Sequence, residues 1–157
     1  MFALATTRFN SDTFNENKNW RLKHNWSGAI YNTPIKTKIP PNQIIFILEM
    51  NNDKNKIEGV GLIRPRICHD KYYKIYSDGN YNRYTYKSNY RIDKSSFSAE
   101  EQKYIWILEQ LIFKGYGHLK RGQGITRVPK SIEYNNKINF IEIFRSLFIK
   151  QFRDLKK

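Results

Sequence analysis

The pattern of apolar positions centres on two neighbouring segments that predict β-strands. Residues 44–50 (IIFILEM) are almost continuously apolar and rich in β-branched side chains, which is typical of a strand buried on both faces. A polar loop at 51–55 leads into a second apolar segment at 57–63, which contains Gly59 and Gly61. We therefore predict a central hairpin. The two glycines mark either a bulge or tight packing, or a place where another backbone or a flat ligand approaches closely.

Apolar periodicity elsewhere predicts one further strand and two helices. Residues 2–6 form a short apolar run typical of a buried strand, and the Asn-rich residues 7–19 are expected to form a polar loop. Residues 98–101 (SAEE) have the pattern of a capping box, and a helical apolar stripe follows them until residues 114–115 (KG) end it. A similar cap at 139–142 predicts a final amphipathic helix.

A tyrosine-rich segment lies between the hairpin and the first predicted helix. The turn signal at 78–80 (DGN) predicts that residues 72–76 and 84–90 pair as a second hairpin. One strand face would then carry aromatic side chains and the other cationic ones, a pattern suited to base stacking and phosphate contacts, or to an edge hairpin protected by charge. These aromatic and cationic residues are Tyr84, Tyr86, Tyr90, Lys87 and Arg91.

The length and composition are those of one domain covering residues 1–157. A single cysteine, Cys68, excludes an internal disulfide framework and favours a reducing compartment. The chain lacks both an apolar run of the roughly 18 residues that span a membrane and the pattern of a signal peptide. We therefore expect no membrane association and an intracellular location, cytoplasmic, nuclear or within a virion.

The formal net charge of +14 and the sequence pI near 9.9 change this picture most. Such a charge exceeds what solubility requires, so a polyanionic partner is the economical explanation. Codon bias toward A and T could account for the abundant lysine and asparagine, but not for the arginine residues. We expect a nucleic-acid partner, RNA rather than DNA, and neither a metal nor a cofactor, because histidine and carboxylate residues show no ligand spacing.

Two segments carry the candidate binding chemistry. Residues 20–32 place aromatic side chains among polar ones, where they either complete the core or line a pocket for a base. Residues 114–129 combine four glycines with cations, so they form either a phosphate-binding loop or a flexible basic connection, and they do not match the P-loop pattern. The candidate base-binding residues are Trp20, Trp26, Tyr31 and Asn32; the candidate phosphate-binding residues are His118, Lys120, Arg121 and Arg127, with Arg64 and Arg66 as supporting cations.

The order of three motifs resembles the PUA-like superfamily, and within it the EVE and YTH domains. These motifs are residues 26–32 (WSGAIYN), 41–48 (PNQIIFIL) and 57–63 (IEGVGLI), and the resemblance covers about residues 1–65. It implies a small curved mixed β-barrel flanked by helices, which together with the two predicted C-terminal helices gives an α+β fold. It also implies a pocket for a single, often methylated, nucleobase.

Two site residues can be carried over from this resemblance. Trp26 matches the pocket-side tryptophan of the W-x-G segment, and Asn32 lies near the polar contact to the base edge, whereas Trp20 and Tyr31 are nominated by proximity alone. Asn42 and Gln43 stand where the families usually have Gly-Asp, and the residues after 65 show no match to them.

These observations predict a non-enzymatic RNA-binding domain that captures one nucleotide, methylated or unmodified. A variant of this function is cap binding, in which two tryptophan rings sandwich a methylated guanine. Two alternatives stay open: a packaging or virion protein that coats nucleic acid regardless of sequence, and a ribonuclease that uses His118 with the neighbouring cations.

Overall fold

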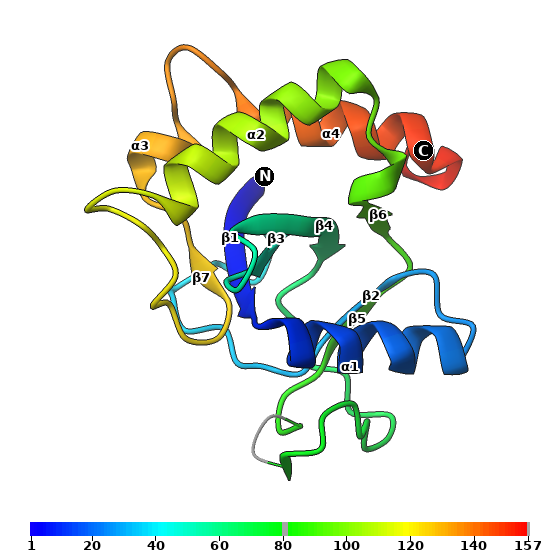
Figure 1. The fold of residues 1–157 in the computed structure, drawn as a ribbon. Coiled ribbons are helices and arrows are strands. Elements are labelled where there is room, and N and C mark those ends of the chain that lie inside the picture. Colours follow the sequence, from blue (N-terminus) through cyan, green and yellow to red (C-terminus); the bar gives the residue numbers. More distant parts are fainter. Residues whose placement is uncertain (80–81, 157) are drawn as a thin grey trace.

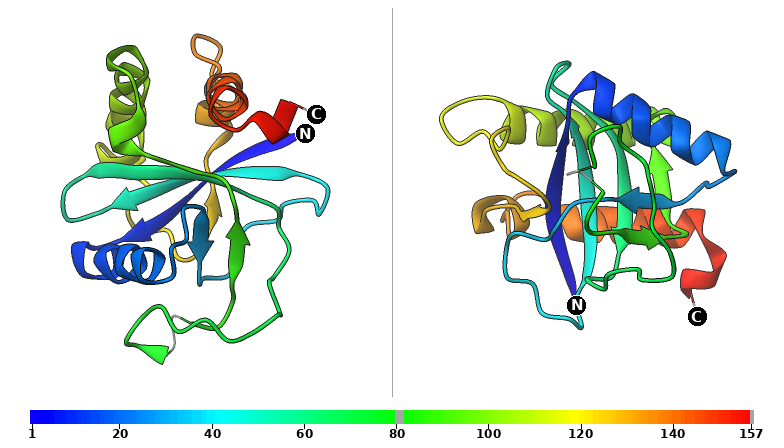
Figure 2. Two further views of the ribbon diagram at one scale, coloured as in Figure 1. Left: turned by 90° about the vertical axis from the view of Figure 1, so that its right-hand side faces the viewer. Right: turned by 90° about the horizontal axis from the view of Figure 1, so that it is seen from below.

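The computed structural model describes residues 1–79 and 82–156 as a mixed five-stranded sheet with the strand order β6-β4-β3-β1-β7 (Figure 1). Helices α2 and α4 cover one face of this sheet, while α1 and a two-stranded sheet, β2-β5, cover the other (Figure 2). The elements in chain order are β1 (Phe2–Phe9), α1 (Ser11–Lys23), β2 (Ala29–Tyr31), β3 (Ile44–Asn51), β4 (Lys56–Ile63), β5 (Tyr86–Ser88), β6 (Arg91–Asp93), η2 (Lys94–Ser96), α2 (Ala99–Phe113), β7 (Thr126–Arg127), α3 (Lys130–Glu133), α4 (Phe140–Gln151) and η3 (Arg153–Lys156).

The α+β class with a mixed sheet is confirmed. The five-stranded sheet is open, with β6 and β7 at its two edges, so the described part of the chain shows no closed barrel. Among these same residues, no helix is long and apolar enough to cross a membrane.

The predicted central hairpin is confirmed as β3 and β4. β3 lies in the middle of the sheet, parallel to β1 and antiparallel to β4, and most of its side chains are fully buried. The strand predicted at residues 2–6 is also confirmed, although β1 continues to Phe9.

The glycines of β4 lie where side chains from other elements cross the strand. A Cβ on Gly61 would overlap the hydroxyl oxygen of Tyr31 and lie 2.9 Å from the Ala29 Cβ. A Cβ on Gly59 would lie 2.5 Å from Nη2 of Arg91. The expectation of tight packing is thus confirmed, and a register shift opposite this strand, between Leu48 and Met50, supplies the expected irregularity.

The polar loop predicted at residues 7–19 is wrong, because α1 occupies most of it. Asn10 caps the helix: its Oδ1 accepts a hydrogen bond from the Thr13 N–H at 2.8 Å, and the Thr13 Oγ1 accepts one from the Asn10 N–H at 3.0 Å. The helix buries only Phe14 and Asn17, so it has no apolar stripe to reveal it. The Asn17 amide instead donates to the Ile30 carbonyl at 2.8 Å and anchors the helix on β2.

The second hairpin, predicted between residues 72–76 and 84–90, is also wrong. Instead, β5 pairs with β2 and β6 pairs with β4, so the expected aromatic face does not form. Asn82 organises the intervening loop, because its Oδ1 accepts from the Ile75 and Tyr76 N–H groups and its Nδ2 donates to the Tyr76 carbonyl. The turn signal included Asn80, which lies outside the described residues, as does Tyr81.

Both predicted C-terminal helices are confirmed. The Ser98 side chain caps α2 in a capping box with Glu101, and Asn139 caps α4 by accepting from the Glu142 N–H. Gly115 follows α2 with a positive φ of 81°. The two helices bury their apolar faces against β3, where the Phe46 ring lies among aromatic rings of α4.

Candidate functional site

A cavity of about 680 Å³ opens where β1 ends and α1 begins. Its walls come from segments far apart in the sequence: the β1–α1 junction, the end of β2 and the loop after it, Asn52, Tyr76, residues 83–84 and residues 123–124. This volume falls within the range typical of small-molecule sites, about 300–1,000 Å³.

The rim of this cavity is cationic. Arg8, Lys36 and Arg83 line it, and all three side chains are exposed, whereas none of the lining residues that the structure describes is acidic. Asn10 and Thr13, which form the N-terminal cap of α1, lie beside them. At this helix end the Asp53 carboxylate accepts a hydrogen bond from the Ser11 N–H at 2.9 Å, so the net positive charge of the rim comes from the three cations. The cavity therefore favours an anionic group.

The wall also offers hydrogen-bonding groups. Asn52 donates from Nδ2 to the Lys120 carbonyl at 2.9 Å, while its Oδ1 is buried and has no hydrogen-bond partner among the described residues. A buried acceptor without a partner costs about 1–3 kcal/mol. Asn52 is itself one of the residues that line the cavity.

Behind the cavity lies a buried charged network that holds Tyr31. The Tyr31 hydroxyl donates to Glu49 Oε2 at 2.6 Å, and Arg91 donates to the same carboxylate from Nε at 3.0 Å and from Nη2 at 2.6 Å. Arg91 also pairs with Asp93 at 3.0 Å. The side chains of Arg91 and Glu49 are only 4% and 2% exposed, so water screens this pair little.

Burial and the surrounding charges set the protonation states in this network. Burial and the neighbouring Glu49 carboxylate raise the pKa of the Tyr31 hydroxyl well above its ordinary value, so it stays a donor. Burial alone would raise the pKa of Glu49, but the Arg91 guanidinium outweighs it, and the pKa of Glu49 lies below its ordinary value. Tyr31 thus forms a fixed wall.

Of the four predicted base-binding residues, Tyr31 and Asn32 line the cavity. Asn32 is nonetheless engaged by the protein: its Nδ2 donates to the Tyr73 carbonyl at 2.8 Å and to Asn82 Oδ1 at 3.0 Å, and its Oδ1 accepts from Thr85 Oγ1 at 2.8 Å. Both residues therefore shape the wall, and Asn32 also joins it to Tyr73, Asn82 and Thr85. Neither has a polar group left over for a full base edge.

The two predicted tryptophans lie outside the set of lining residues. Trp20 stacks on His24 with 4.2 Å between ring centroids, because the two are one helical turn apart on α1. Trp26 donates from Nε1 to the Ala29 carbonyl at 3.1 Å, and the Lys87 ammonium lies 4.1 Å from the centroid of one of its rings. Both rings are half-buried and pack against the buried apolar cluster that contains Ile30, Ile45 and Tyr73.

The predicted phosphate-binding residues are not brought together at the cavity. The Arg127 guanidinium pairs with Glu133, with Nε to Oε2 at 2.9 Å, and Lys120 donates to Asn55 Oδ1 at 2.7 Å. The His118 Nδ1 accepts from the Lys120 N–H at 3.3 Å. The exposed residues Arg121, Arg64 and Arg66 also lie outside the lining set.

The glycine-rich segment still contributes to the site through Gln123 and Gly124. Gly124 has a positive φ of 70° and packs against the Pro34 carbonyl, so a side chain is excluded there. Of the cations that line the cavity, Arg8 lies just before α1, in the segment that was expected to be a polar loop. The signal for this helix was present, since Asn10 and Thr13 have the spacing of a cap.

Within residues 1–79 and 82–156, no group of three or more histidine, cysteine or carboxylate side chains is arranged to hold a metal ion. We compared the chain with protein-family models, with curated proteins and with solved structures, and none of the three comparisons gave a match.

Proposed function

We propose that this cavity binds one nucleotide of a nucleic acid, RNA in preference to DNA, and that the protein acts by binding rather than by catalysis. One observation carries the proposal: a cavity of nucleotide size has a rim of three cations, no acidic lining residue in the described part of the chain, and a wall of tyrosine and amide groups. A nucleotide has the features that complement such a cavity: a phosphate, a flat ring and polar ring edges.

Each part of the cavity has a distinct task in this proposal. Tyr84 is 41% exposed and offers a ring on which a base can stack, which is worth roughly 1–3 kcal/mol per base. Arg8 and Lys36 contact the phosphate beside the cap of α1.

The PUA-like architecture belongs to the same proposal. It is supported by the position of the W-x-G segment, because the end of that segment, Tyr31 and Asn32, lies in the cavity wall. The base would then enter beside this segment, as the resemblance implies, but it would stack on Tyr84 rather than on Trp26. Methyl-base selectivity would depend on the space left beside Tyr76 and Tyr84.

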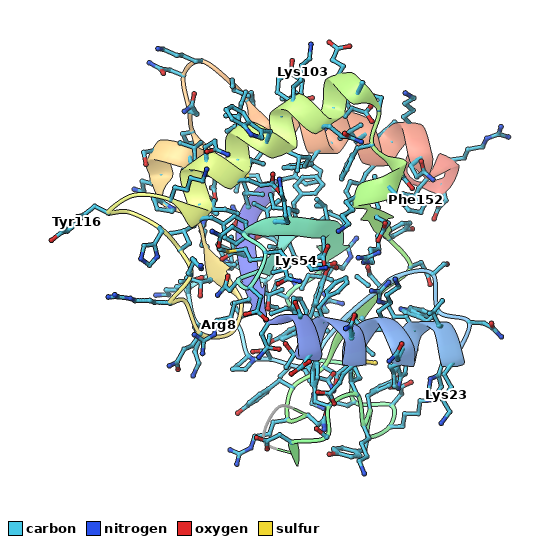
Figure 3. All side chains as sticks on the ribbon, viewed as in Figure 1. Arg8, Lys23, Lys54, Lys103, Tyr116 and Phe152 are labelled. Atoms are coloured by element: carbon cyan, nitrogen blue, oxygen red, sulfur yellow. The ribbon has the colours of Figure 1, made fainter. Side chains whose placement is uncertain are left out.

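A pair of lysine substitutions tests the proposal. Lys36→Ala removes a cation from the cavity rim. Lys103→Ala removes the same charge from α2, which lies well away from Arg8, another residue of the cavity rim (Figure 3). Fluorescence anisotropy with a short single-stranded RNA near physiological salt should show at least tenfold weaker binding for Lys36→Ala, about 1.4 kcal/mol. Lys103→Ala should bind like the wild type.

The proposal would be refuted if the two lysine variants behaved alike. Equal, small losses for both variants would mean that the whole basic surface binds nucleic acid, and the packaging function would then replace the proposal. The base contact has its own test, since Tyr84→Ala should reduce the affinity more than Tyr134→Ala, which removes a ring that is 64% exposed on the C-terminal side of α3.

A further inference from the structure

A second hollow, of about 350 Å³, adjoins the first cavity. Arg83 and Tyr84 line both, so these two residues form the partition between them. Its other lining residues belong to an irregular loop at residues 67–73, or are Asn82 and Thr85. The two hollows are therefore successive sites on one surface rather than opposite faces of the molecule.

The second hollow exposes aromatic surface next to cations. The Tyr72 side chain is 67% exposed and Tyr84 is 41% exposed, although burying either ring would be favourable. Lys71 lines the hollow as well, and its ammonium lies 5.2 Å from the centroid of the Tyr73 ring. Exposed aromatic rings beside cations are the combination that binds single-stranded nucleic acid without base pairing.

The one carboxylate in the loop at 67–73 is engaged within the loop itself. Asp70 accepts hydrogen bonds from Cys68 Sγ at 2.9 Å and from the Tyr73 hydroxyl at 2.7 Å. These contacts lower the pKa of Asp70 from its ordinary value, the Cys68 hydrogen bond being the largest cause. Asp70 is not among the residues that line the hollow, whose described lining includes the cations Lys71 and Arg83 and no carboxylate.

Buried amides fix the shape of this hollow. Asn82 closes the loop by bonding to the backbone of residues 75 and 76, and Asn32 joins it to the end of β2 through Asn82 and Thr85. Asn82 and Thr85 are themselves lining residues, so the same hydrogen bonds set the wall of the hollow. The site is thus formed before any ligand arrives, which lowers the entropic cost of binding.

We propose that the second hollow binds the nucleotide adjacent to the one in the first cavity, so that the ligand is a single-stranded polynucleotide rather than a free nucleotide. The inference rests on the proposed function of the first cavity. The strand passes over the partition formed by Arg83 and Tyr84, and the neighbouring base stacks on Tyr72. Lys71 lies beside the backbone of that nucleotide.

The test compares ligands of two lengths. The four nucleoside 5′-monophosphates and the corresponding RNA homopentamers are titrated against the wild type, Tyr72→Ala and the control Tyr134→Ala. The wild type should bind its best pentamer at least tenfold more tightly than the matching monophosphate. Tyr72→Ala should lose about 5- to 150-fold in pentamer affinity, the equivalent of one stacked base, and keep its monophosphate affinity within about twofold.

Two results would overturn the inference, and Lys36→Ala separates them. If Lys36→Ala weakens both ligands while Tyr72→Ala binds the pentamer like Tyr134→Ala, the second subsite is refuted and the first cavity stands. If Lys36→Ala weakens neither ligand, the function proposed for the first cavity fails and the second subsite fails with it. Tyr72 is mostly exposed, so its removal should leave the melting temperature unchanged, which the same samples check.

Discussion

Replacing Gly61 by alanine tests how Tyr31 is held at the back of the cavity. The new Cβ would overlap the Tyr31 hydroxyl oxygen, which must then move away from Glu49. Overpacking of this kind costs about 1–3 kcal/mol, and a lost hydrogen bond to a charged group costs about 1.5–3 kcal/mol. We expect Gly61→Ala to lower the free energy of unfolding by about 3–5 kcal/mol, a large part of a typical total of about 5–15 kcal/mol.

The measurement is urea unfolding followed by circular dichroism, with Gly117→Ala as the matched control. A Cβ on Gly117 would meet no atom within 4 Å, so this control should change the free energy of unfolding by no more than about 0.5 kcal/mol. A lower midpoint with an unchanged slope would assign the effect to the folded state. A difference between Gly61→Ala and the control of less than about 1 kcal/mol would refute the reasoning.

A double-mutant cycle identifies the overlapping atom. Tyr31→Phe removes the hydroxyl and should cost about 1.5–3 kcal/mol by itself, while Arg91 continues to pair with Glu49. When Gly61→Ala is combined with Tyr31→Phe, it should cost at least about 1 kcal/mol less than in the wild type, because only the ring carbon and the Ala29 Cβ, each 2.9 Å away, remain to be displaced. Additivity within about 0.5 kcal/mol would show that the hydroxyl is not the obstacle.

Three further predictions concern the cap, the pH dependence and the salt dependence. Asn10→Ala should destabilise the protein by about 1 kcal/mol in urea unfolding, because α1 loses its cap, and no change would mean that tertiary contacts alone hold the helix. The pKa of Tyr31 is raised in the folded protein, so above about pH 10 this hydroxyl ionises first in the unfolded chain and the free energy of unfolding should fall. Tyr31→Phe should show a shallower fall with pH, and identical pH profiles for the two proteins would contradict this. Lys36→Ala should reduce the slope of log Kd against log salt for single-stranded RNA by about 0.7, and an unchanged slope would remove the phosphate contact from Lys36.

The parts of the fold that could be predicted from the sequence are those where burial follows a regular period. The β3–β4 hairpin and helices α2 and α4 bury continuous apolar faces, and their caps are local, so the pattern alone indicates them. Helix α1 could not be found in this way, because it is held by one phenylalanine and by the amide of Asn17 rather than by an apolar stripe. The loop organised by Asn82 could not be predicted either, because the hydrogen-bond partners of Asn82 lie between 6 and 50 residues away from it along the chain.

For the candidate site too, local sequence signals were informative and long-range contacts were not. Tyr31 and Asn32 were found because aromatic and amide residues cluster in one segment, but their side chains are engaged by Glu49 and Asn82, and this engagement depends on long-range contacts. A cation in a basic loop gives no indication of its partner, so the pairing of Arg127 with Glu133 was not foreseen. The cations of the cavity rim, such as Lys36, come together only through the arrangement of the sheet.

The parallel pairing of β1 with β3 has a consequence for how the protein folds. Phe2 lies opposite Ile44, so this pairing closes the whole length of chain between them, whereas the β3–β4 hairpin closes through a short turn. Closing the longer loop costs more entropy, and we expect β1 to dock after the hairpin has formed. Because the end of β1 forms part of the cavity, the cavity would then be completed only after this docking step, and a ligand bound there would stabilise only the protein in which β1 has docked.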